Sequence, residues 1–211
     1  MIKYPKIRTP FQRDVMGSKK LIENVFQDEA IAYLKNCLWC CTEKVDGTNI
    51  GIYWDGHGIT FQGRTEKSEI PKALLQKLNG LFGGDVNEEL FEQKFGSTHV
   101  ILYGEGYGGD IQKKKHYRED CSFILFDVYL PESDLWLKRD AIEDIAYMFN
   151  IDAVPIVMTG TLQEAVGYVK RKPKSIIADT DMEGLVCKPI IEMRDRQNQR
   201  IVIKVKVKDF V

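Results

Sequence analysis

The sequence lacks any long apolar run. A membrane-spanning helix needs about 20 consecutive apolar residues, and no stretch of the 211 residues approaches that length. The first ten residues, Met1 to Pro10, carry charges throughout and contain nothing like the apolar core of a signal peptide. These absences predict a cytoplasmic protein without membrane contact.

Cysteine is scarce and poorly arranged for disulfides. The five cysteines are an odd number, and Cys40 and Cys41 are adjacent. Cys37 and Cys40 form a C-x-x-C pair, but a structural zinc ion needs four ligands, and no second cysteine pair or paired histidines complete the set. We therefore interpret these cysteines as small apolar residues that lead into a buried strand.

An excess of charge of either sign is also absent. The 30 lysines and arginines nearly balance the 31 acidic residues, for a formal net charge of −1. Contact with nucleic acid must therefore come from a local basic patch rather than from the charge of the whole molecule. There is no internal repeat, low-complexity tract or linker-like stretch, so we expect a single domain over residues 1–211.

Apolar spacing and turn residues predict an α+β fold of antiparallel sheets with helices packed outside. An irregular stretch, with prolines at positions 5 and 10, precedes the first helix. The predicted strands cover residues 38–43, 50–54, 59–62, 100–102, 123–130, 184–190 and 200–207. The predicted helices cover residues 28–35, 71–81, 86–95 and 138–149, and a capping box at Thr161–Glu164 opens another. In the last strand, alternation places Lys204, Lys206 and Lys208 on one face.

The segment with the most specific chemical signal is Thr42–Asn49, T-E-K-V-D-G-T-N. Its lysine, Lys44, stands between an apolar strand and a glycine turn, a position expected to face a cleft. An amine can act as a nucleophile when burial or nearby cations favour its neutral form. Taken alone, the segment is most simply interpreted as an exposed lysine in a turn.

Later segments supply what a lysine that takes up phosphate would need. Glu105 follows a predicted strand directly, and Glu183 directly precedes another. Two carboxylates can hold a divalent metal or ribose hydroxyls, while Lys204 and Lys206 can bind a triphosphate. Phe126 adds an aromatic ring near a strand end, where it either stacks on a purine or belongs to the core.

These motifs occur in the order typical of the covalent nucleotidyltransferase superfamily of ATP-dependent ligases and GTP-dependent capping enzymes, which the chain resembles from Thr42 to Lys206. It is most similar to the RNA ligase branch typified by the second RNA ligase of T4-type phages. Features shared with that branch are Glu43-Lys44 followed by Gly47-Thr48-Asn49, Arg64, and the Glu183–Pro189 segment. The resemblance implies a nucleotidyltransferase domain, ATP-grasp-like in its antiparallel sheets flanked by helices.

The resemblance also implies roles for individual residues. Lys44 would be the nucleophile that takes AMP, and Glu183, Lys204 and Lys206 would support catalysis. Contacts with the nucleotide or the RNA end would come from the residues matching the family's motifs: Thr42 and Glu43 (main chain, adenine edge), Asn49 and Arg64 (phosphate or RNA end), Glu105 (ribose), Phe126 (adenine stacking, with Phe123 less favoured), Lys188, Lys204 and Lys206 (phosphates). Glu105 and Glu183 are the implied ligands of Mg²⁺ or Mn²⁺.

The function implied is that of an ATP-dependent RNA ligase acting in RNA repair. Lys44 would form a lysyl-AMP, the AMP would pass to an RNA 5′-phosphate, and a 3′-hydroxyl would then displace it. The alternatives are a DNA ligase, a capping-type guanylyltransferase, or a non-catalytic module that binds nucleotide or RNA. The sequence ends five residues after Lys206, without the OB-fold or helical module of larger members. Three interpretations follow: the domain is a minimal ligase, it seals strands with an accessory domain or protein partner, or it is a piece of a longer chain.

A basic run, Lys113–Arg118, lies between the strands of Glu105 and Phe126. Neutralised phosphates supply most nonspecific affinity for nucleic acid, so the run either grips an RNA backbone or forms a solvated loop.

Overall fold

The computed structural model describes residues 2–65, 68–112 and 116–210. The chain divides into two compact units. Unit 1 comprises Met1–Pro5 and Asp46–Val154, and unit 2 comprises Lys6–Val45 and Pro155–Val211. The segment T-E-K-V-D-G is therefore shared, because Lys44 belongs to unit 2 whereas Asp46 and Gly47 belong to unit 1.

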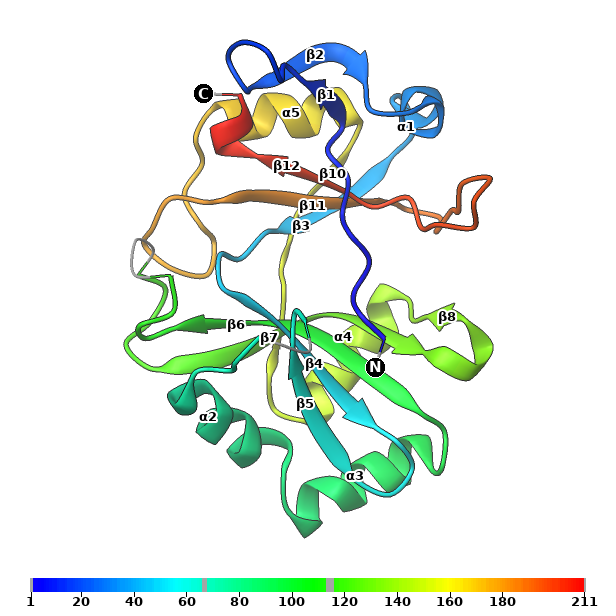
Figure 1. Cartoon of the computed structure of the whole chain (residues 1–211), viewed down its shortest axis with the longest axis vertical. Coiled ribbons are helices and arrows are strands. Elements are labelled where there is room, and N and C mark those ends of the chain that lie inside the picture. The colour runs from blue at the N-terminus through cyan, green and yellow to red at the C-terminus, as the bar shows by residue number, and fades with distance from the viewer. Residues whose placement is uncertain (1, 66–67, 113–115, 211) are drawn as a thin grey trace. The chain divides into compact units, whose positions relative to one another are not determined.

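Unit 1 is built on a largely antiparallel sheet with the strand order β5-β4-β6-β7-β8 (Figure 1). A short strand, β9, pairs with β7 in parallel. The strands are β4 (Thr48–Trp54), β5 (Ile59–Gly63), β6 (Val100–Gly108), β7 (Cys121–Leu130), β8 (Leu135–Trp136) and β9 (Asp152–Ala153). Strand residues alternate between the two faces of such a sheet, so each face has its own composition.

Helices cover one face of this sheet and form the main core of unit 1 with it. They are α2 (Lys72–Phe82), α3 (Asp85–Phe95) and α4 (Arg139–Met148). Ile50, Ile52 and Leu102 of the sheet are fully buried against Leu78 and Phe91 of the helices. The opposite face carries a smaller aromatic cluster around Tyr103 and Trp136.

A β-bulge interrupts the pairing of β6 and β7. Tyr103 lies opposite Asp127, but Gly104 lies opposite Leu125, so Phe126 is an extra residue without a partner on β6. A bulge turns two successive side chains toward the same side of the strand. Leu125 and Val128 accordingly enter the main core, and Phe126 joins the aromatic cluster on the opposite face.

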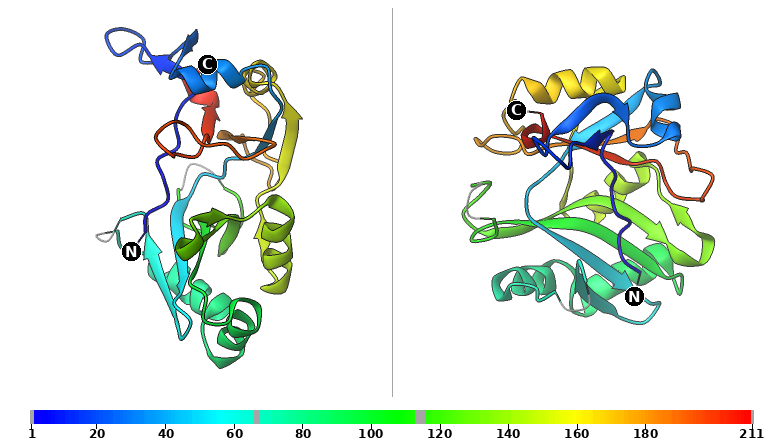
Figure 2. Two further views of the ribbon diagram at one scale, coloured as in Figure 1. Left: turned by 90° about the vertical axis from the view of Figure 1, so that its right-hand side faces the viewer. Right: turned by 45° about the horizontal axis from the view of Figure 1, so that its top comes forward.

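Unit 2 contains an antiparallel sheet with the order β10-β3-β11-β12. Its strands are β3 (Trp39–Glu43), β10 (Ile156–Gly160), β11 (Gly184–Pro189) and β12 (Ile203–Lys206). One face is covered by α5 (Leu162–Lys170) and α1 (Glu29–Leu34), together with a hairpin of β1 (Phe11–Arg13) and β2 (Leu21–Phe26) (Figure 2). The core of unit 2 lies on this covered side.

The α+β prediction is confirmed, and most predicted helices and strands form near their predicted bounds. The strand predicted over residues 100–102 is longer, because β6 continues to Gly108, so Glu105 lies within the strand rather than after it. β10 was not predicted. The capping box is present, with Thr161 accepting from the backbone N–H of Glu164. The prediction of an irregular N-terminal stretch was wrong in part, because β1 and β2 form there. β1 is only three residues long and β2 is exposed apart from its ends, so neither shows the alternation of a buried strand.

The last strand also ends earlier than predicted. β12 stops at Lys206, and a 3₁₀ turn, η2 (Val207–Asp209), follows. Lys208 therefore leaves the strand face shared by Lys204 and Lys206, which corrects the predicted set of three lysines. Among the described residues, no helix is both long and apolar enough to cross a membrane.

Candidate active site

The face of the unit 2 sheet opposite the core is rich in lysine. Along β3, β11 and β12 the core-facing residues are buried and the residues between them are half-buried. Two of the predicted site residues of this unit, Glu43 and Glu183, do not belong to this half-buried strand set. The set contains the other five: Thr42, Lys44, Lys188, Lys204 and Lys206. Strand alternation thus collects four ammonium groups on one face.

Two of these lysines share the carboxylate of Glu183. Lys44 Nζ donates to Glu183 Oε2 at 2.7 Å, and Lys206 Nζ is paired with Glu183 Oε1. The side chains of Lys44, Glu183 and Lys206 are 20%, 11% and 18% exposed, so the cluster is partly shielded from water yet accessible. The structure therefore brings together three of the four residues predicted to be catalytic.

Backbone pairing sets this geometry. Gly184 lies opposite Lys206, and the N–H of Lys44 donates to the carbonyl of Gly184 at 2.9 Å. A Cβ on Gly184 would lie 2.1 Å from the carbonyl oxygen of Val205, so only glycine permits this close approach of β11 to β12. Glu183 is consequently held between the strand ends that carry the two lysines.

The electrostatics of the cluster favour an ionised carboxylate. Burial alone would raise the pKa of Glu183, but the charges and hydrogen bonds of Lys44 and Lys206 outweigh it and lower the pKa below its usual value. Glu183 is thus an anion between two cations at neutral pH. Such a cluster carries a local positive charge and suits the binding of a further anion.

Thr42 and Glu43 are engaged within unit 2. Thr42 Oγ1 donates to the carbonyl of Val186 at 3.3 Å. Glu43 is 1% exposed and points to the core side, where its Oε2 accepts from the N–H of Ile176 at 2.9 Å. The N–H of Glu43 itself donates to the carbonyl of Pro155. Recognition of the adenine edge by these main-chain groups stays a prediction.

The predicted residues of unit 1 share the sheet face opposite its main core. Asn49 on β4 lies directly opposite Glu105 on β6, and Arg64 follows β5 where the ladder would next face Asn49. Gly47 approaches the same edge, since a Cβ there would lie 2.2 Å from the carbonyl oxygen of Gly106. The glycine of the lysine motif is therefore required for close packing against β6.

The two candidate stacking residues differ in their surroundings. Phe123 is 1% exposed and packs edge-on against Phe82 in the main core, with ring centroids 5.5 Å apart. Phe126 is half-buried on the opposite face, which also carries Glu105. The geometry supports Phe126 as the stacking candidate and gives Phe123 a role in the core.

Two described residues of the basic run, Tyr117 and Arg118, form hydrogen bonds with other residues of unit 1. Lys113, Lys114 and Lys115 lie outside the described residues. Arg118 Nε donates to Asp120 Oδ1 at 2.6 Å, and the Tyr117 hydroxyl accepts from the N–H of Asp46 at 3.2 Å. Tyr117 thus supports the lysine motif directly, a function that its place in a basic run did not indicate.

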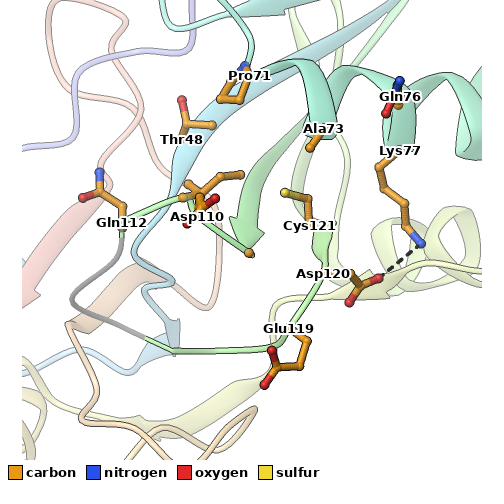
Figure 3. Close-up of a pocket in the computed structure, with 12 residues that line it drawn as sticks. Thr48, Pro71, Ala73, Gln76, Lys77, Asp110, Gln112, Glu119, Asp120 and Cys121 are labelled. Atoms are coloured by element: carbon orange, nitrogen blue, oxygen red, sulfur yellow. Dashed lines mark ion pairs between the residues drawn. The ribbon is translucent and has the colours of Figure 1, made fainter.

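A groove of ≈ 860 Å³ also opens in unit 1, between the start of α2 and the turn that joins β6 to β7 (Figure 3). Asp110, Glu119 and Asp120 line it together with Lys77, which pairs with Asp120 at 3.9 Å. None of the predicted site residues lines this groove. Its acidic rim is unsuited to phosphate, so we do not assign the nucleotide to it.

The donor groups around the lysine-rich face determine which kind of metal site it can form. Among the described residues, no three His, Cys, Asp or Glu side chains are grouped so as to hold a metal ion. Mg²⁺ bound with a nucleotide usually takes one or two carboxylates, with phosphates and water completing its shell. Glu183 fits such a phosphate-borne cation, whereas the described residues do not form a dedicated protein cage.

Comparisons with known proteins identify the fold and the family of this chain. The chain is similar over 96–98% of its length to solved structures of RNA ligase from Naegleria gruberi. A variant with ATP and Mn gives a TM-score of 0.64 at 19% identity, and an apo variant gives 0.65 at 17%. The chain spans only 64% and 61% of those two chains. At such identities, the likeness establishes the fold.

A comparison with curated proteins finds no match. The family model described as RNA ligase matches residues 38–206, a range that contains every residue of the lysine cluster as well as Asn49, Glu105 and Phe126. The chain therefore belongs to the RNA ligase family.

Proposed function

We propose that this protein is an ATP-dependent RNA ligase in which Lys44 becomes covalently adenylylated. The observation that carries the proposal is the cluster of Lys44, Glu183 and Lys206 on the lysine-rich face. Family membership supports the reaction class, and the Naegleria gruberi structures with ATP or AMP and Mn support the choice of nucleotide and divalent cation.

The first step forms a P–N bond between Lys44 Nζ and the α-phosphorus of ATP, and the bond from that phosphorus to the pyrophosphate breaks. Lys44 must lose a proton first. Glu183 contacts its Nζ at 2.7 Å, but the lowered pKa of this carboxylate makes it a weak base while both lysines pair with it. Lys206, with Lys204 on the same strand face, can neutralise the charge that develops on the phosphates. A divalent cation beside Glu183 would assist the departure of pyrophosphate.

Two later steps complete sealing. An oxygen of an RNA 5′-phosphate attacks the lysyl-AMP phosphorus and releases the Lys44 amine. A 3′-hydroxyl then attacks that 5′-phosphate, and AMP leaves as the phosphodiester forms. The roles implied by resemblance for Asn49, Arg64, Glu105, Phe126 and Lys188 are part of this proposal, as is Glu105 as a metal ligand.

The test is the intact mass of the protein after incubation with ATP and Mg²⁺. We expect the wild type to gain one AMP and Lys44→Ala to gain nothing. Lys208→Ala is a matched control, because Lys208 is exposed in η2 and off the strand face. A wild type that stays unmodified would refute self-adenylylation, and an adduct from GTP rather than ATP would indicate a capping-type enzyme.

Sealing is tested separately with a 5′-phosphorylated RNA and its DNA equivalent, each offered with a 3′-hydroxyl partner strand. Joined RNA supports the ligase assignment. Protein that gains AMP but joins only DNA would contradict the RNA substrate.

A further inference from the structure

The N-terminal segment of unit 1 contacts the residue expected to stack on adenine. We propose that Tyr4 positions the ring of Phe126 for stacking on the purine of the nucleotide, and that Asp127 holds Tyr4 in place through its hydroxyl. This inference rests on the proposed function and adds a positioning residue from the N-terminal segment.

The bulge makes such a device necessary. Phe126 is the extra residue of the bulge, with no partner opposite it on β6. Regular pairing fixes a strand residue from both sides, whereas an unpaired bulge residue depends on side-chain packing for its orientation. A ring that must meet a planar base therefore needs a support outside the ladder.

Tyr4 supplies this support. Its ring meets Phe126 edge-on, with centroids 5.0 Å apart and an interplanar angle of 78°. It also meets Tyr103 at 5.1 Å and Trp136 at 5.5 Å, again edge-on. Edge-to-face pairs at these separations are favourable and directional. The ring of Tyr4 is thus packed between the ring of Phe126 and the rings of Tyr103 and Trp136.

Asp127 explains why this residue is a tyrosine. The carboxylate is fully buried, and its Oδ2 accepts a hydrogen bond from the Tyr4 hydroxyl at 2.8 Å. A buried carboxylate is costly unless it is hydrogen-bonded, and bonds to it are stronger than those between neutral groups. Because the bulge turns Phe126 and Asp127 to the same side, one tyrosine contacts both.

The segment before Tyr4 is anchored as well. The carbonyl oxygen of Ile2 accepts from the hydroxyls of Tyr53 at 2.5 Å and Tyr103 at 2.7 Å. Burial raises the pKa of both tyrosines, which keeps these hydroxyls protonated as donors. The N-terminal segment is therefore bound at Ile2 and again at Tyr4.

The test measures the affinity for ATP in a Lys44→Ala background, where no covalent step occurs, by calorimetric titration. Base–aromatic stacking is lost on removal of the ring at a cost of about 5- to 150-fold in affinity. We expect Tyr4→Leu to raise the Kd within this range and Tyr4→Phe, which keeps the ring, to raise it less. Tyr147→Leu is the control, because Tyr147 is 89% exposed on α4 of the same unit.

A double variant separates positioning from general damage. If Tyr4 acts through Phe126, Tyr4→Leu adds almost no further loss once Phe126→Leu is present. With Lys44 intact, stacking is made equally in the bound and transition states, so Tyr4→Leu should raise KM for ATP and leave kcat of adenylylation nearly unchanged.

An unchanged Kd in Tyr4→Leu, or a full additional loss in the Phe126→Leu background, would overturn the inference. If Tyr4→Leu fails to fold by circular dichroism, Tyr4→Phe decides, since a Kd equal to that of the parent also refutes the inference. If ATP affinity depends on Tyr4 as expected but the wild type gains no AMP, the proposed function is refuted and the inference stays intact.

Discussion

Replacing Glu183 by glutamine tests the electrostatic account of the lysine cluster. The substitution keeps the size of the side chain and one acceptor oxygen but removes the charge that two ammonium groups share. Lys44 and Lys206 then face each other across a neutral amide. We expect the variant to be less stable and unable to form the adduct at the normal rate.

The size of the stability loss follows from the contacts. A hydrogen bond to a charged group contributes about 1.5–3 kcal/mol, and removing one partner of a fully buried ion pair costs about 3–5 kcal/mol. The lysines here are 20% and 18% exposed, so water relieves part of this cost. We therefore expect Glu183→Gln to lower the free energy of unfolding by about 2–3 kcal/mol at pH 7.

The measurement is urea denaturation followed by the fluorescence of Trp39, which is fully buried in the core of unit 2. Trp54 and Trp136 are first replaced by phenylalanine, so that the signal comes from Trp39. Glu23→Gln is the matched control in the same unit. Glu23 pairs with Lys170 at 2.5 Å, but both side chains are exposed, at 46% and 40%. Exposed pairs contribute about 0–1 kcal/mol, so the control should lose far less than Glu183→Gln.

The pH dependence provides the refutation. The folded-state pKa of Glu183 lies below the unfolded value of 4.5, so the stabilisation is complete above that pH and is lost as pH falls through the folded pKa. The difference between wild type and Glu183→Gln should therefore shrink on acidification below about pH 4.5. A difference that is the same at pH 7 and pH 3, or no larger than that of Glu23→Gln, would contradict the reasoning.

Four further substitutions, one of them a control, test the framework around the site by urea denaturation. Gly104→Ala places a Cβ 2.2 Å from Phe123 Cζ and should lower the free energy of unfolding by at least about 1–3 kcal/mol. Its control is Gly80→Ala, in α2 with open space around it, which should raise the free energy of unfolding by about 0.5–1 kcal/mol. Equal effects of the two substitutions would disprove the packing argument. Tyr117→Phe removes the acceptor of the Asp46 N–H, so about 1 kcal/mol and part of the adenylylation rate should be lost. Thr161→Ala deletes the N-cap of α5 and should cost about 1 kcal/mol without changing adenylylation.

Much of the site was predictable because it depends on local patterns. Alternation along 200–207 placed Lys204 and Lys206 on one face, and the position of Glu183 directly before a predicted strand placed its carboxylate at a strand end. The order of the motifs indicated that Lys44 and Glu183 serve one reaction, although they are far apart in sequence. The pairing of β11 with both β3 and β12 is what brings Lys44, Glu183 and Lys206 together.

The remaining features depend on register and on long-range contacts, which local sequence patterns do not reveal. The bulge at Phe126 arises from the offset between β6 and β7, and neither strand shows it alone. Tyr4 reaches Asp127 across 123 residues of sequence. Tyr117 is placed by its contact with Asp46 rather than by its basic neighbours. Lys208 was assigned to the strand face because alternation continues in sequence beyond the point where β12 ends.

The arrangement of the cluster has a consequence for the proposed reaction. In the structure Lys44 donates to Glu183, and an ammonium that donates in this way has no lone pair for attack on phosphorus. Glu183 is simultaneously engaged by Lys206, which weakens it as a base for Lys44. A triphosphate on the lysine-rich face would offer Lys206 a stronger anionic partner and return the basicity of Glu183 to Lys44. Nucleotide binding would thus activate the nucleophile, and Lys206 would couple the two events.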